Sequence, residues 1–520
     1  MNYSVGIDFG TLSARAVLVN LTCGSEVASA EYVYPHAVME TALPSGKKLE
    51  KNFALQHPAD YLEALKSVID ALICKTGVKN TDIKGVGIDF TSCTVLPVDE
   101  NGTPLCLKKE FEDEPHAYAK LWKHHGAENE ADAVTLAAAE CGEPFLTAYG
   151  GRVNSEMILP KILETYNKAP HVYKAASYFV EAGDWIVWQL TGRNVRNSCM
   201  AGFKSCWTAE DGMPSDKFFE KIGVDMREKL CKEIVTTGTF AGCVNIGGAR
   251  ISGLYEGCAV AAPIIDAHAA LPAAGITDNG KLMLIIGTSG CQIVQVKERI
   301  DIDGIVGRVY GGVTEGLYAY EAGQTGVGDI FAWFTDNAVP TEYKKEADEK
   351  GISLHTLLSE KAAKYAVGES GLVALDWWNG CRSPYGDFSL RGCIFGLSLA
   401  TKPEEIYRAL IEATAYGTKC IVDMYEKGGL VIDEVYATGG ISKKNPFLMQ
   451  IYADVIGKEI KVSDNSASYG SALLGARAAG ADKKYAFKTA AIYTPDKANT
   501  EKYETIYKKY LRLAEFIKEI

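Results

Sequence analysis

The sequence lacks several features that would assign it to a common class of protein. Its 14 cysteines form no C-x-x-C pair and keep no regular spacing, so reduced thiols are expected instead of a zinc site or a disulfide framework. No apolar run approaches the length of about 18 residues that a membrane-spanning helix needs. No basic stretch precedes the first apolar segment. We therefore expect a soluble protein of the cytoplasm.

Positive charge is also in deficit. The chain has 54 Lys and Arg against 66 Asp and Glu, which gives a net charge of −12. Nucleic acids are bound by basic surfaces, so we expect neither nucleic acid nor a membrane as a main partner. A small anion can still bind at a local basic site. The G-x-x-x-x-G-K-[ST] phosphate loop is absent, so a nucleotide would need another kind of cradle.

What is present is an α/β pattern long enough for two domains. The 520 residues exceed what one hydrophobic core usually organises. In the first half, hydrophobic periodicity predicts an antiparallel meander of strands at 3–9, 14–20 and 26–34, then a helix at 57–74 and a strand at 84–90. This β-β-β-α-β order differs from the strict alternation of a dinucleotide-binding sheet.

The second half begins in a similar way. Apolar runs predict strands at 282–286 and 292–296, and a later strand at 434–438 lies between helices at 403–425 and 445–456. The pattern indicates a duplicated core with its ligand between the two halves.

Two short turns carry hydroxyl groups at equivalent places in the halves. In the first, Gly10-Thr11-x-Ser13 joins two strands, and Arg15 could add charge. A glycine there lets backbone N–H groups and hydroxyls face an anion. Asp8 ends the preceding strand, where a carboxylate can hold Mg²⁺ through water. An ordinary hairpin turn with an incidental aspartate would have the same sequence.

The second turn, Gly287-Thr288-Ser289, favours the phosphate interpretation. It follows an apolar strand, as the first turn does. Repetition of a core does not by itself require Thr and Ser at both tips. Two such hairpins could clamp one triphosphate from opposite sides.

Asp266, in the segment PIIDAHAALP, is a candidate catalytic base. As a carboxylate at a strand end it could accept the proton of an attacking hydroxyl in phosphoryl transfer. The alternative is a helix N-cap, where Asp is common. We expect His268 to be a packed or hydrogen-bonded histidine. Gly439-Gly440, between a strand and a helix, could border a flat adenine ring, although a plain turn would also use glycine.

Four ordered motifs resemble the FGGY family of carbohydrate kinases, and the resemblance spans nearly the whole chain. They are GIDFGTLSAR, PIIDAHAALPAAG, LIIGTSG and ATGGISKKNPFLMQIYAD. The resemblance implies two α/β, ribonuclease H-like (actin/Hsp70/hexokinase-type) domains with the active site in a cleft between them. We place the domains at 1–272, with an insertion around 102–243, and at 273–520.

The resemblance also implies roles for individual residues in a reaction of ATP, Mg²⁺ and a sugar. Asp266 is the implied catalytic base, and the implied Mg²⁺ lies near Asp8 and Asp266. The implied nucleotide-binding residues are Asp8, Gly10, Thr11, Ser13, Arg15, Gly287, Thr288, Ser289, Gly439, Gly440 and Asn445. The implied sugar-binding residues are Ser92, Lys204, Asp266 and Glu321.

Within the family, segments such as NFALQHPADY, LWKHHGA and ALDWWNGCRSP resemble the ribulokinase branch. This likeness implies phosphorylation of the O5 hydroxyl of a ketopentose, with L-ribulose as the expected substrate. Trp122-Lys123-His124-His125 stands where many FGGY kinases have Trp-x-Asp-x-Arg, which disfavours glycerol, xylulose and gluconate kinases. A solvated helix face would also explain the two histidines. D-ribulose, xylulose and pentitol kinases stay open as alternatives, as does a homodimer.

Two rival functions belong to other classes. A non-enzymatic nucleotide switch of the actin or chaperone type shares both phosphate turns, but it needs no polar pocket for a polyol. A sugar sensor that has lost catalysis would have no need of Asp8 and Asp266.

The letters GIDF occur twice, at residues 6–9 and 87–90. The first copy leads into the phosphate turn, and the second leads into Thr91-Ser92, whose small hydroxyl side chains suit a sugar. Asp89, in the second copy, is expected to accept hydrogen bonds from the N–H groups of its own turn.

Overall fold

The computed structural model describes residues 2–481, 483–485 and 487–519. Within these ranges no helix is both long and apolar enough to cross a membrane. The chain forms two compact units. The first consists of residues up to Asp278, Gly307–Ala319 and Asn465–Phe487, and the second of Asn279–Val306, Tyr320–Asp464 and the residues from Lys488 onward. Both units use distant parts of the chain, and the boundary at residue 272 stays a prediction.

The first unit is built on a sheet whose strands run in the order β11-β12-β5-β1-β2-β3. As predicted, β1 (Tyr3–Phe9), β2 (Ser13–Asn20) and β3 (Ser25–Val33) form an antiparallel meander. The helix α1 (Pro58–Thr76) returns the chain to β5 (Ile83–Phe90), which pairs parallel with β1. The remaining strands are β11 (Phe240–Cys243), β12 (Ala259–Ala261) and β13 (Ile264–Ile265), the last of which pairs with β5.

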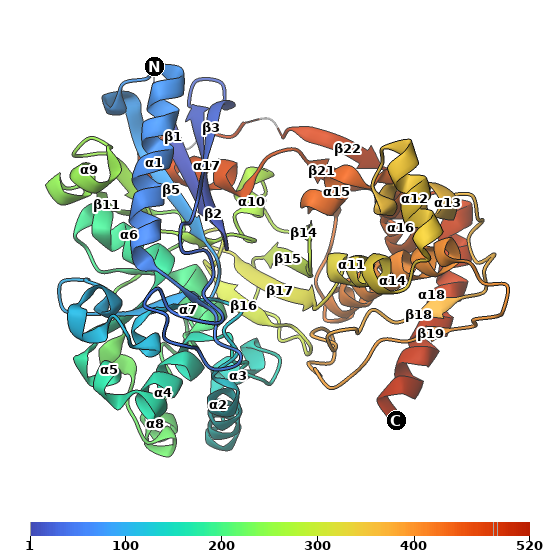
Figure 1. The fold of residues 1–520 in the computed structure, drawn as a ribbon, viewed down its shortest axis with the longest axis horizontal. Coiled ribbons are helices and arrows are strands. Elements are labelled where there is room, and N and C mark those ends of the chain that lie inside the picture. Colours follow the sequence, from blue (N-terminus) through green and yellow to red (C-terminus); the bar gives the residue numbers. More distant parts are fainter. Residues whose placement is uncertain (1, 482, 486, 520) are drawn as a thin grey trace. The chain divides into compact units, whose positions relative to one another are not determined.

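Glycines on one face of this sheet let the helix α17 (Ala467–Ala478) lie directly on the strands, as Figure 1 shows. A Cβ on Gly6 would lie 1.8 Å from the carbonyl oxygen of Ser468. A Cβ on Gly87 would lie 1.8 Å from the carbonyl oxygen of Ser471. No side chain fits in such a space, so the backbone of α17 takes the place that side chains would occupy.

The opposite face of the sheet is aromatic. Because side chains alternate along a strand, Phe9 and Phe90 point away from α17. Their rings stack with centroids 5.1 Å apart, and Tyr61 of α1 meets both rings edge-on. The two GIDF copies therefore lie side by side in register, with glycine beside glycine and phenylalanine beside phenylalanine.

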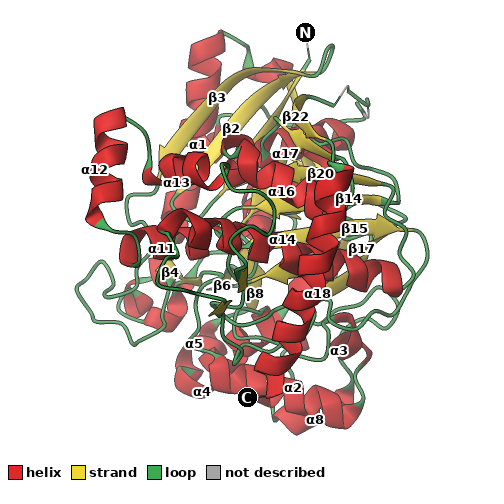
Figure 2. Ribbon diagram, turned by 90° about the vertical axis from the view of Figure 1, so that its right-hand side faces the viewer, coloured by secondary structure: helices red, strands yellow, loops and turns green. Residues whose placement is uncertain are grey.

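The predicted insertion around 102–243 contains a group of helices and two strands of a small sheet, whose other two strands precede residue 102. The sheet has the order β4-β7-β6-β8 and consists of β4 (Leu55–Gln56), β7 (Ala119–Lys120), β6 (Val95–Val98) and β8 (Tyr178–Glu181). Below it in Figure 2 lie α2 (Glu128–Cys141), α3 (Pro144–Ala148), α4 (Ile158–Lys168), α5 (Pro170–Ala175) and α8 (Asp216–Ile222). The first unit also contains α6 (Ala182–Thr191), α7 (Ser198–Lys204), α9 (Ile246–Ser252), α10 (Ala270–Ala273), β9 (Arg196–Asn197), β10 (Ile234–Val235) and β16 (Gly307–Tyr310).

The second unit repeats the hairpin and parallel strand of the first. As predicted, β14 (Lys281–Ile286) and β15 (Gly290–Val296) form a hairpin. The predicted strand β20 (Glu434–Thr438) pairs parallel with β14. Within this unit the strand order is β17-β15-β14-β20-β21-β22, which adds β17 (Tyr318–Gln324), β21 (Ile460–Ser463) and β22 (Thr489–Tyr493). A separate pair is formed by β18 (Val373–Ala374) and β19 (Ile394–Phe395).

Both helices that the sequence predicts in the second unit, at 403–425 and 445–456, are present as α14 and α16. Pro403 and Pro446 occupy the first turns of α14 and α16, where the N–H that proline lacks has no helical partner. The helices are α11 (Gly328–Asn337), α12 (Thr341–Lys350), α13 (Leu354–Ala362), α14 (Pro403–Lys427), α15 (Gly440–Lys444), α16 (Pro446–Ile456) and α18 (Lys497–Glu519).

Candidate active site

The two GIDF copies bring carboxylates together at the ends of neighbouring strands. Asp8 on β1 pairs in register with Asp89 on β5. Strand β13 runs parallel to the end of β5, so Asp266 follows at the same edge, and its N–H donates to the Phe90 carbonyl at 3.0 Å. Three carboxylates from three segments of the first unit therefore lie at the carboxyl ends of parallel strands, where α/β sheets bind ligands.

Burial raises the pKa of all three carboxyl groups, and the charge of Asp8 adds to the rise in the other two. Desolvation raises the pKa of Asp8. Desolvation and then the charge of Asp8 hold the pKa of the fully buried Asp89 well above its usual range. The same two causes raise the pKa of Asp266 to about 7. A carboxylate with a pKa near neutrality is a suitable general base, so the cluster combines a candidate base with an excess of negative charge.

The first phosphate turn is tight, and two of its polar side chains contact the neighbouring strand. The Gly10 N–H donates to the Ser13 carbonyl at 3.0 Å, which closes the turn between β1 and β2. Ser13 Oγ and Arg15 Nε both donate to Oε1 of Glu31 on β3, at 2.9 and 3.0 Å. Glu31 thus holds two groups that the sequence assigns to the nucleotide, and a bound anion would compete with it for them.

Thr11, at the tip of this turn, is held by two residues that the sequence analysis did not assign to the site. Its carbonyl accepts a hydrogen bond from Gln56 Nε2 at 2.8 Å, and its hydroxyl accepts one from Trp122 Nε1 at 3.2 Å. Both residues lie in segments that resemble the ribulokinase branch, and that likeness was the available signal for them.

The predicted sugar-binding residues of the first unit gather around the turn that follows β5. Ser92 is half-buried there beside Cys93, whose φ of 59° lies in the left-handed region. Burial raises the pKa of both Cys93 and Asp266, and the nearby charge of Lys204 at the end of α7 opposes that rise in both. Strand β13 pairs with the end of β5, and α7 contacts β13, so the structure brings together the segments that carry Ser92, Lys204 and Asp266.

In the second unit, the turn Gly287-Thr288-Ser289 joins β14 and β15. The N–H of Gly287 donates to the Ser289 carbonyl at 3.0 Å, so this turn is also closed by a glycine N–H and a serine carbonyl, but it is one residue shorter than the first. The Thr288 carbonyl accepts from the Val327 N–H at 2.9 Å, at the start of α11. The side chains of Thr288 and Ser289 are exposed. The turn is thus fixed through its backbone while both hydroxyls lie at the surface of this unit.

A close backbone approach requires glycine at position 439. Gly439 has a φ of 111°, and a Cβ there would lie 2.2 Å from the Ile286 carbonyl oxygen at the end of β14. At Gly440 a Cβ would meet no atom within 4 Å, so the surface beside it is open. The Asn445 side chain caps α16, because its Oδ1 accepts from the Leu448 N–H at 3.0 Å. The glycine pair thus borders the strand that leads into the second phosphate turn.

Glu321, the fourth predicted sugar-binding residue, lies on β17 in the second unit. It is 7% exposed, and its carbonyl accepts from the Val306 N–H at 2.8 Å. It belongs to a different compact unit from Ser92 and Lys204, so its part in sugar binding stays a prediction.

Two expectations for histidines have different outcomes. His268 is buried with its Nδ1 3.1 Å from Cys199 Sγ, which confirms a packed and hydrogen-bonded histidine. The alternative of a solvated helix face is wrong for His124, which lies outside the helices and is buried with its Nε2 2.9 Å from Glu164 Oε2. His125, beside it, is exposed.

Two aspartates also differ from what local sequence suggests. The expectation that Asp89 binds its own turn is wrong, because α17 lies on β5 and Asp89 accepts from Ser471 Oγ at 2.5 Å. Its Oδ1 is buried without a hydrogen-bond partner among the residues described. Asp266 does not cap α10, whose N-cap is Ala269; its Oδ1 instead accepts from the Ala267 N–H at 2.7 Å.

Comparison with known proteins identifies the family. Residues 3–272 match the N-terminal domain of the FGGY family of carbohydrate kinases, and residues 282–479 match its C-terminal domain. The chain belongs to the FGGY family of carbohydrate kinases. As a member of a kinase family, the FGGY kinase uses ATP and acts on a small sugar.

Similar proteins agree with this assignment. The FGGY kinase is 46% identical to a ribulokinase of Bacillus licheniformis, over 96% of this chain and 94% of the relative. It is 45% identical to a ribulokinase of Geobacillus thermodenitrificans, over 99% and 94%. A xylulose kinase from Rhodospirillum rubrum superposes with a TM-score of 0.82 at 24% identity, covering 100% and 99% of the chains. A glycerol kinase from Plasmodium falciparum gives 0.78 at 18% identity, covering 98% of each. At these identities the two structures establish the fold, and the predicted two-domain α/β sugar-kinase fold is confirmed.

Proposed function

We propose that this FGGY kinase is a ribulokinase, which transfers the γ-phosphoryl group of ATP to the O5 hydroxyl of L-ribulose. Relatives named ribulokinase share 41 to 46% identity with it over nearly the full chain. The observation that carries the proposal is the setting of Asp266, a carboxyl group with a pKa of about 7 near Lys204. A base of that strength beside hydroxyl-binding groups suits a kinase that acts on a polyol.

Asp266 is proposed to accept the proton of the attacking hydroxyl. The Ala267 N–H fixes Oδ1 at 2.7 Å and so orients the carboxylate. As the proton moves to Asp266, the O5 oxygen forms a bond to the γ phosphorus, and the bond between that phosphorus and the bridging oxygen of ADP breaks. Holding the base and the hydroxyl within reach of each other is a large part of what phosphoryl transfer requires of a protein.

The sugar hydroxyls are proposed to be held by Ser92, Lys204 and Glu321. Ser92 offers a hydroxyl that both donates and accepts, Lys204 donates, and Glu321 accepts, so together they match the mixed character of a polyol. The first domain, 1–272, would then carry most of the sugar contacts.

The ATP phosphates are proposed to lie against the N–H groups and hydroxyls of both hairpin turns. Binding at the first turn would replace the contacts of Ser13 and Arg15 with Glu31. The adenosine is proposed to lie beside Gly439-Gly440 in the second domain, 273–520, with Asn445 contributing its backbone because its side chain caps α16. ATP as a substrate favours a cytoplasmic location.

The carboxylate edge of the first unit fits a divalent cation. Mg²⁺ prefers carboxylate oxygens together with water and phosphate. Burial raises the pKa of Asp8, Asp89 and Asp266, and the charge of Asp8 raises it further in Asp89 and Asp266. A cation would offset that negative charge. Asp89 Oδ1 is buried without a hydrogen-bond partner among the described residues. We propose that Asp8 and Asp266 hold Mg²⁺, which would supply positive charge to the β and γ phosphates.

A coupled assay of ADP release tests the function. The protein is given MgATP with each of L-ribulose, D-ribulose, L-xylulose, D-xylulose, ribitol and arabitol, and the product position is read by NMR. We expect L-ribulose to have the highest kcat/KM, by about tenfold or more, and phosphorylation at C5. ADP release that does not depend on sugar would indicate a nucleotide switch. Sugar binding without ADP release would indicate a sensor, and a different preferred sugar would move the protein to another branch of the family.

A further inference from the structure

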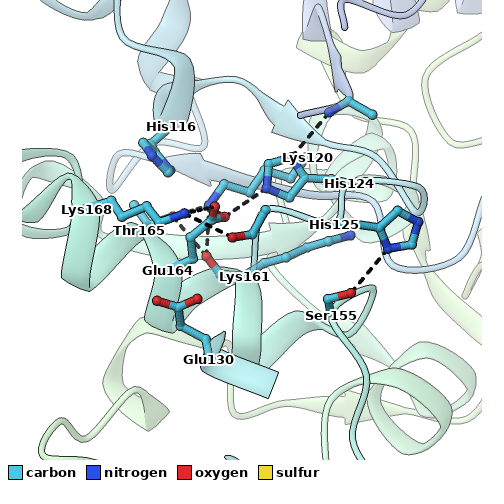
Figure 3. A network of polar contacts seen from close by, with 12 residues as sticks. His116, Lys120, His124, His125, Glu130, Ser155, Lys161, Glu164, Thr165 and Lys168 are labelled. Atoms are coloured by element: carbon cyan, nitrogen blue, oxygen red, sulfur yellow. Dashed lines mark hydrogen bonds and ion pairs between the residues drawn. The ribbon is translucent and has the colours of Figure 1, made fainter. Parts of the chain in front are cut away.

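Helix α4 carries a polar face that is buried inside the first unit. Lys161, Glu164, Thr165 and Lys168 are spaced three or four residues apart, so they lie on one side of the helix. Lys161, Glu164 and Thr165 are all fully buried, and Lys168 at the end of the helix is exposed. Figure 3 shows this face together with Lys120 and His124. A helix face of this kind must satisfy its polar groups within the protein, since water does not reach them.

Glu164 is the main hydrogen-bond acceptor of this face, but it does not contact Lys161 Nζ. Its carboxylate accepts from Lys120 Nζ at 2.7 Å, from His124 Nε2 at 2.9 Å and from Lys168 Nζ at 3.2 Å. Lys120 also donates to the Lys161 carbonyl and to Thr165 Oγ1. These contacts lie within α4 and between α4 and the segment that begins at β7. In Figure 3 the Lys161 side chain runs away from this cluster.

The ammonium group of Lys161 donates hydrogen bonds to two backbone carbonyls. Its Nζ donates to the Cys93 carbonyl at 2.7 Å and to the Leu121 carbonyl at 2.7 Å. No carboxylate of a described residue lies within ion-pair distance of it. Burial lowers its pKa to about 8, so the ammonium group sits in an unfavourable place. A buried cation that holds only two loop carbonyls stabilises the fold weakly compared with an apolar side chain, which points to a role in placing those loops.

The two carbonyls belong to segments at the candidate active site. Cys93 follows Ser92 in the proposed sugar turn and has a φ of 59°. A left-handed conformation is unfavourable for a residue with a side chain, so it persists only where neighbours hold it. Leu121 precedes Trp122, whose indole donates to Thr11 Oγ1 in the first phosphate turn at 3.2 Å.

The segment around Leu121 has anchors of its own, whereas the Cys93 carbonyl does not. The Leu121 N–H donates to the Ala54 carbonyl at 3.0 Å, and Glu164 holds His124. Among the described residues, Lys161 is the donor to the Cys93 carbonyl. The ends of the turn are held as well, because the Thr91 N–H donates to the Phe9 carbonyl and the Thr94 carbonyl accepts from the Ala182 N–H. Loss of the Lys161 ammonium would therefore free the middle of the turn, at Ser92–Cys93, more than it frees the segment at 121–125.

We propose that Lys161 is a positioning residue for sugar binding, which clamps the Ser92–Cys93 turn to the segment that supports the phosphate turn. The inference rests on the proposed function, since it takes the Ser92 turn to be part of the sugar site. Lys161 touches neither substrate in this proposal. It acts through the backbone of the turn.

The test compares Lys161→Met with Lys120→Met. Both lysines are buried. Lys161 donates to the Cys93 and Leu121 carbonyls, whereas Lys120 donates to groups of α4 and makes no hydrogen bond to the sugar turn. We expect Lys161→Met to raise the KM for the sugar by about 10- to 100-fold, the usual weight of lost hydrogen bonds to a charged group, with the KM for ATP within about twofold. Lys120→Met should lower the thermal midpoint at least as much, because it leaves Glu164 with one cation fewer, yet change the sugar KM by less than about threefold.

Calorimetric titration of sugar in the absence of ATP gives a second readout, which does not depend on turnover. Lys161→Gln keeps a shorter donor and should show a smaller loss of sugar affinity than Lys161→Met. If Lys161→Met does not fold, Lys161→Gln is measured in its place. Equal sugar KM changes in the Lys161→Met and Lys120→Met variants, or parallel changes in the sugar and ATP KM values, would overturn the proposal.

The best sugar of the panel is used throughout, and Ser92→Ala is measured beside these variants. A sugar other than L-ribulose would revise the proposed function and leave the Lys161 result valid. If Ser92→Ala raises the sugar KM and Lys161→Met does not, the positioning role of Lys161 is ruled out while the proposed function stands. If Ser92→Ala does not change the sugar KM, the turn does not hold the sugar, and the positioning role of Lys161 is ruled out as well.

Discussion

Asp8 and Asp89 are paired in register on neighbouring parallel strands, and each follows the same Gly-Ile pair, yet their surroundings differ. Asp8 is half-buried on the strand that leads into the first phosphate turn. Asp89 is fully buried under α17 and accepts from Ser471 Oγ at 2.5 Å. Identical local sequence has thus placed one carboxylate where a ligand can approach and the other where a helix covers it.

This difference predicts unequal effects of the same substitution. Asp8→Asn should raise the Mg²⁺ concentration needed for half-maximal activity by roughly 10- to 100-fold, the usual effect of weakening the groups around a metal. Asp89→Asn should raise it by less than about tenfold, because its contact with Ser471 serves the fold. Titration of activity with Mg²⁺ at saturating ATP and sugar measures both. A larger effect at Asp89 than at Asp8 would assign the metal to the buried carboxylate.

Removal of the proposed base should abolish most of the turnover. Asp266→Asn keeps the size of the side chain but cannot accept the proton, so kcat should fall by roughly 10²- to 10⁴-fold. Steady-state kinetics with L-ribulose measures the change, with Asp70→Asn on the exposed surface of α1 as the control. Turnover within tenfold of the wild type would rule out Asp266 as the base.

The pKa of Asp266 predicts a pH-dependent cost to stability. The pKa is raised from 3.8 to about 7, so between these values the folded protein keeps a proton that the unfolded chain has released. The contribution of this group to the free energy of unfolding therefore falls as pH rises from about 4 to 7, and it stays low above that. Asparagine does not titrate. The thermal midpoint of Asp266→Asn should exceed that of the wild type at pH 8, and the gap should narrow towards pH 5.

Scanning calorimetry in EDTA, without nucleotide or sugar, measures this gap. Asp70→Asn serves as the control substitution, since the Asp70 side chain is half exposed and pairs with Lys66 at the surface. A gap of the same size at pH 5 and pH 8 would contradict the raised pKa of Asp266.

The glycines under α17 predict a large effect from a single methyl group. A Cβ at Gly87 would lie 1.8 Å from the Ser471 carbonyl oxygen, so α17 must move away from β5. Gly87→Ala should lower the free energy of unfolding by about 3 kcal/mol or more. Gly247→Ala, on the exposed side of α9, is the matched control and should change it by less than about 1 kcal/mol. Denaturant unfolding compares the two, and similar midpoints would show that the contact is adaptable.

Lys204 should act on the sugar and not on the nucleotide. Lys204→Ala removes a donor beside Asp266, so the KM for L-ribulose should rise by about tenfold or more while the KM for ATP stays within about twofold. Initial-rate kinetics with each substrate varied in turn separates the two. Equal weakening for both substrates would place Lys204 in the nucleotide site or in the support of the fold.

Elements whose signal is local were predicted closely. Strands β1 and β20 have the predicted bounds, and β14 and α14 differ from prediction by two residues or fewer at either end. Their apolar runs, the proline at the start of α14 and the glycines of the turns act within a few residues, so the pattern alone determines them. The same holds for the two hydroxyl turns, which lie between paired strands as predicted.

The misplaced or missed residues depend on contacts that are distant in sequence. Asp89 meets Ser471, 382 positions away, instead of its own turn. His124 is buried because Glu164, 40 positions on, lies beside it. Lys161 reads as an ordinary lysine on a helix until the fold brings the Cys93 carbonyl to it.

The sequence by itself determined the strand and helix pattern, the two turns, and through its motifs the family, because each of these depends on the order of neighbouring residues. Only the tertiary structure decided which carboxylate is covered, which lysine holds a turn and which histidine is buried. Those outcomes depend on desolvation and on hydrogen bonds between segments, and both arise only when distant parts of the chain pack together.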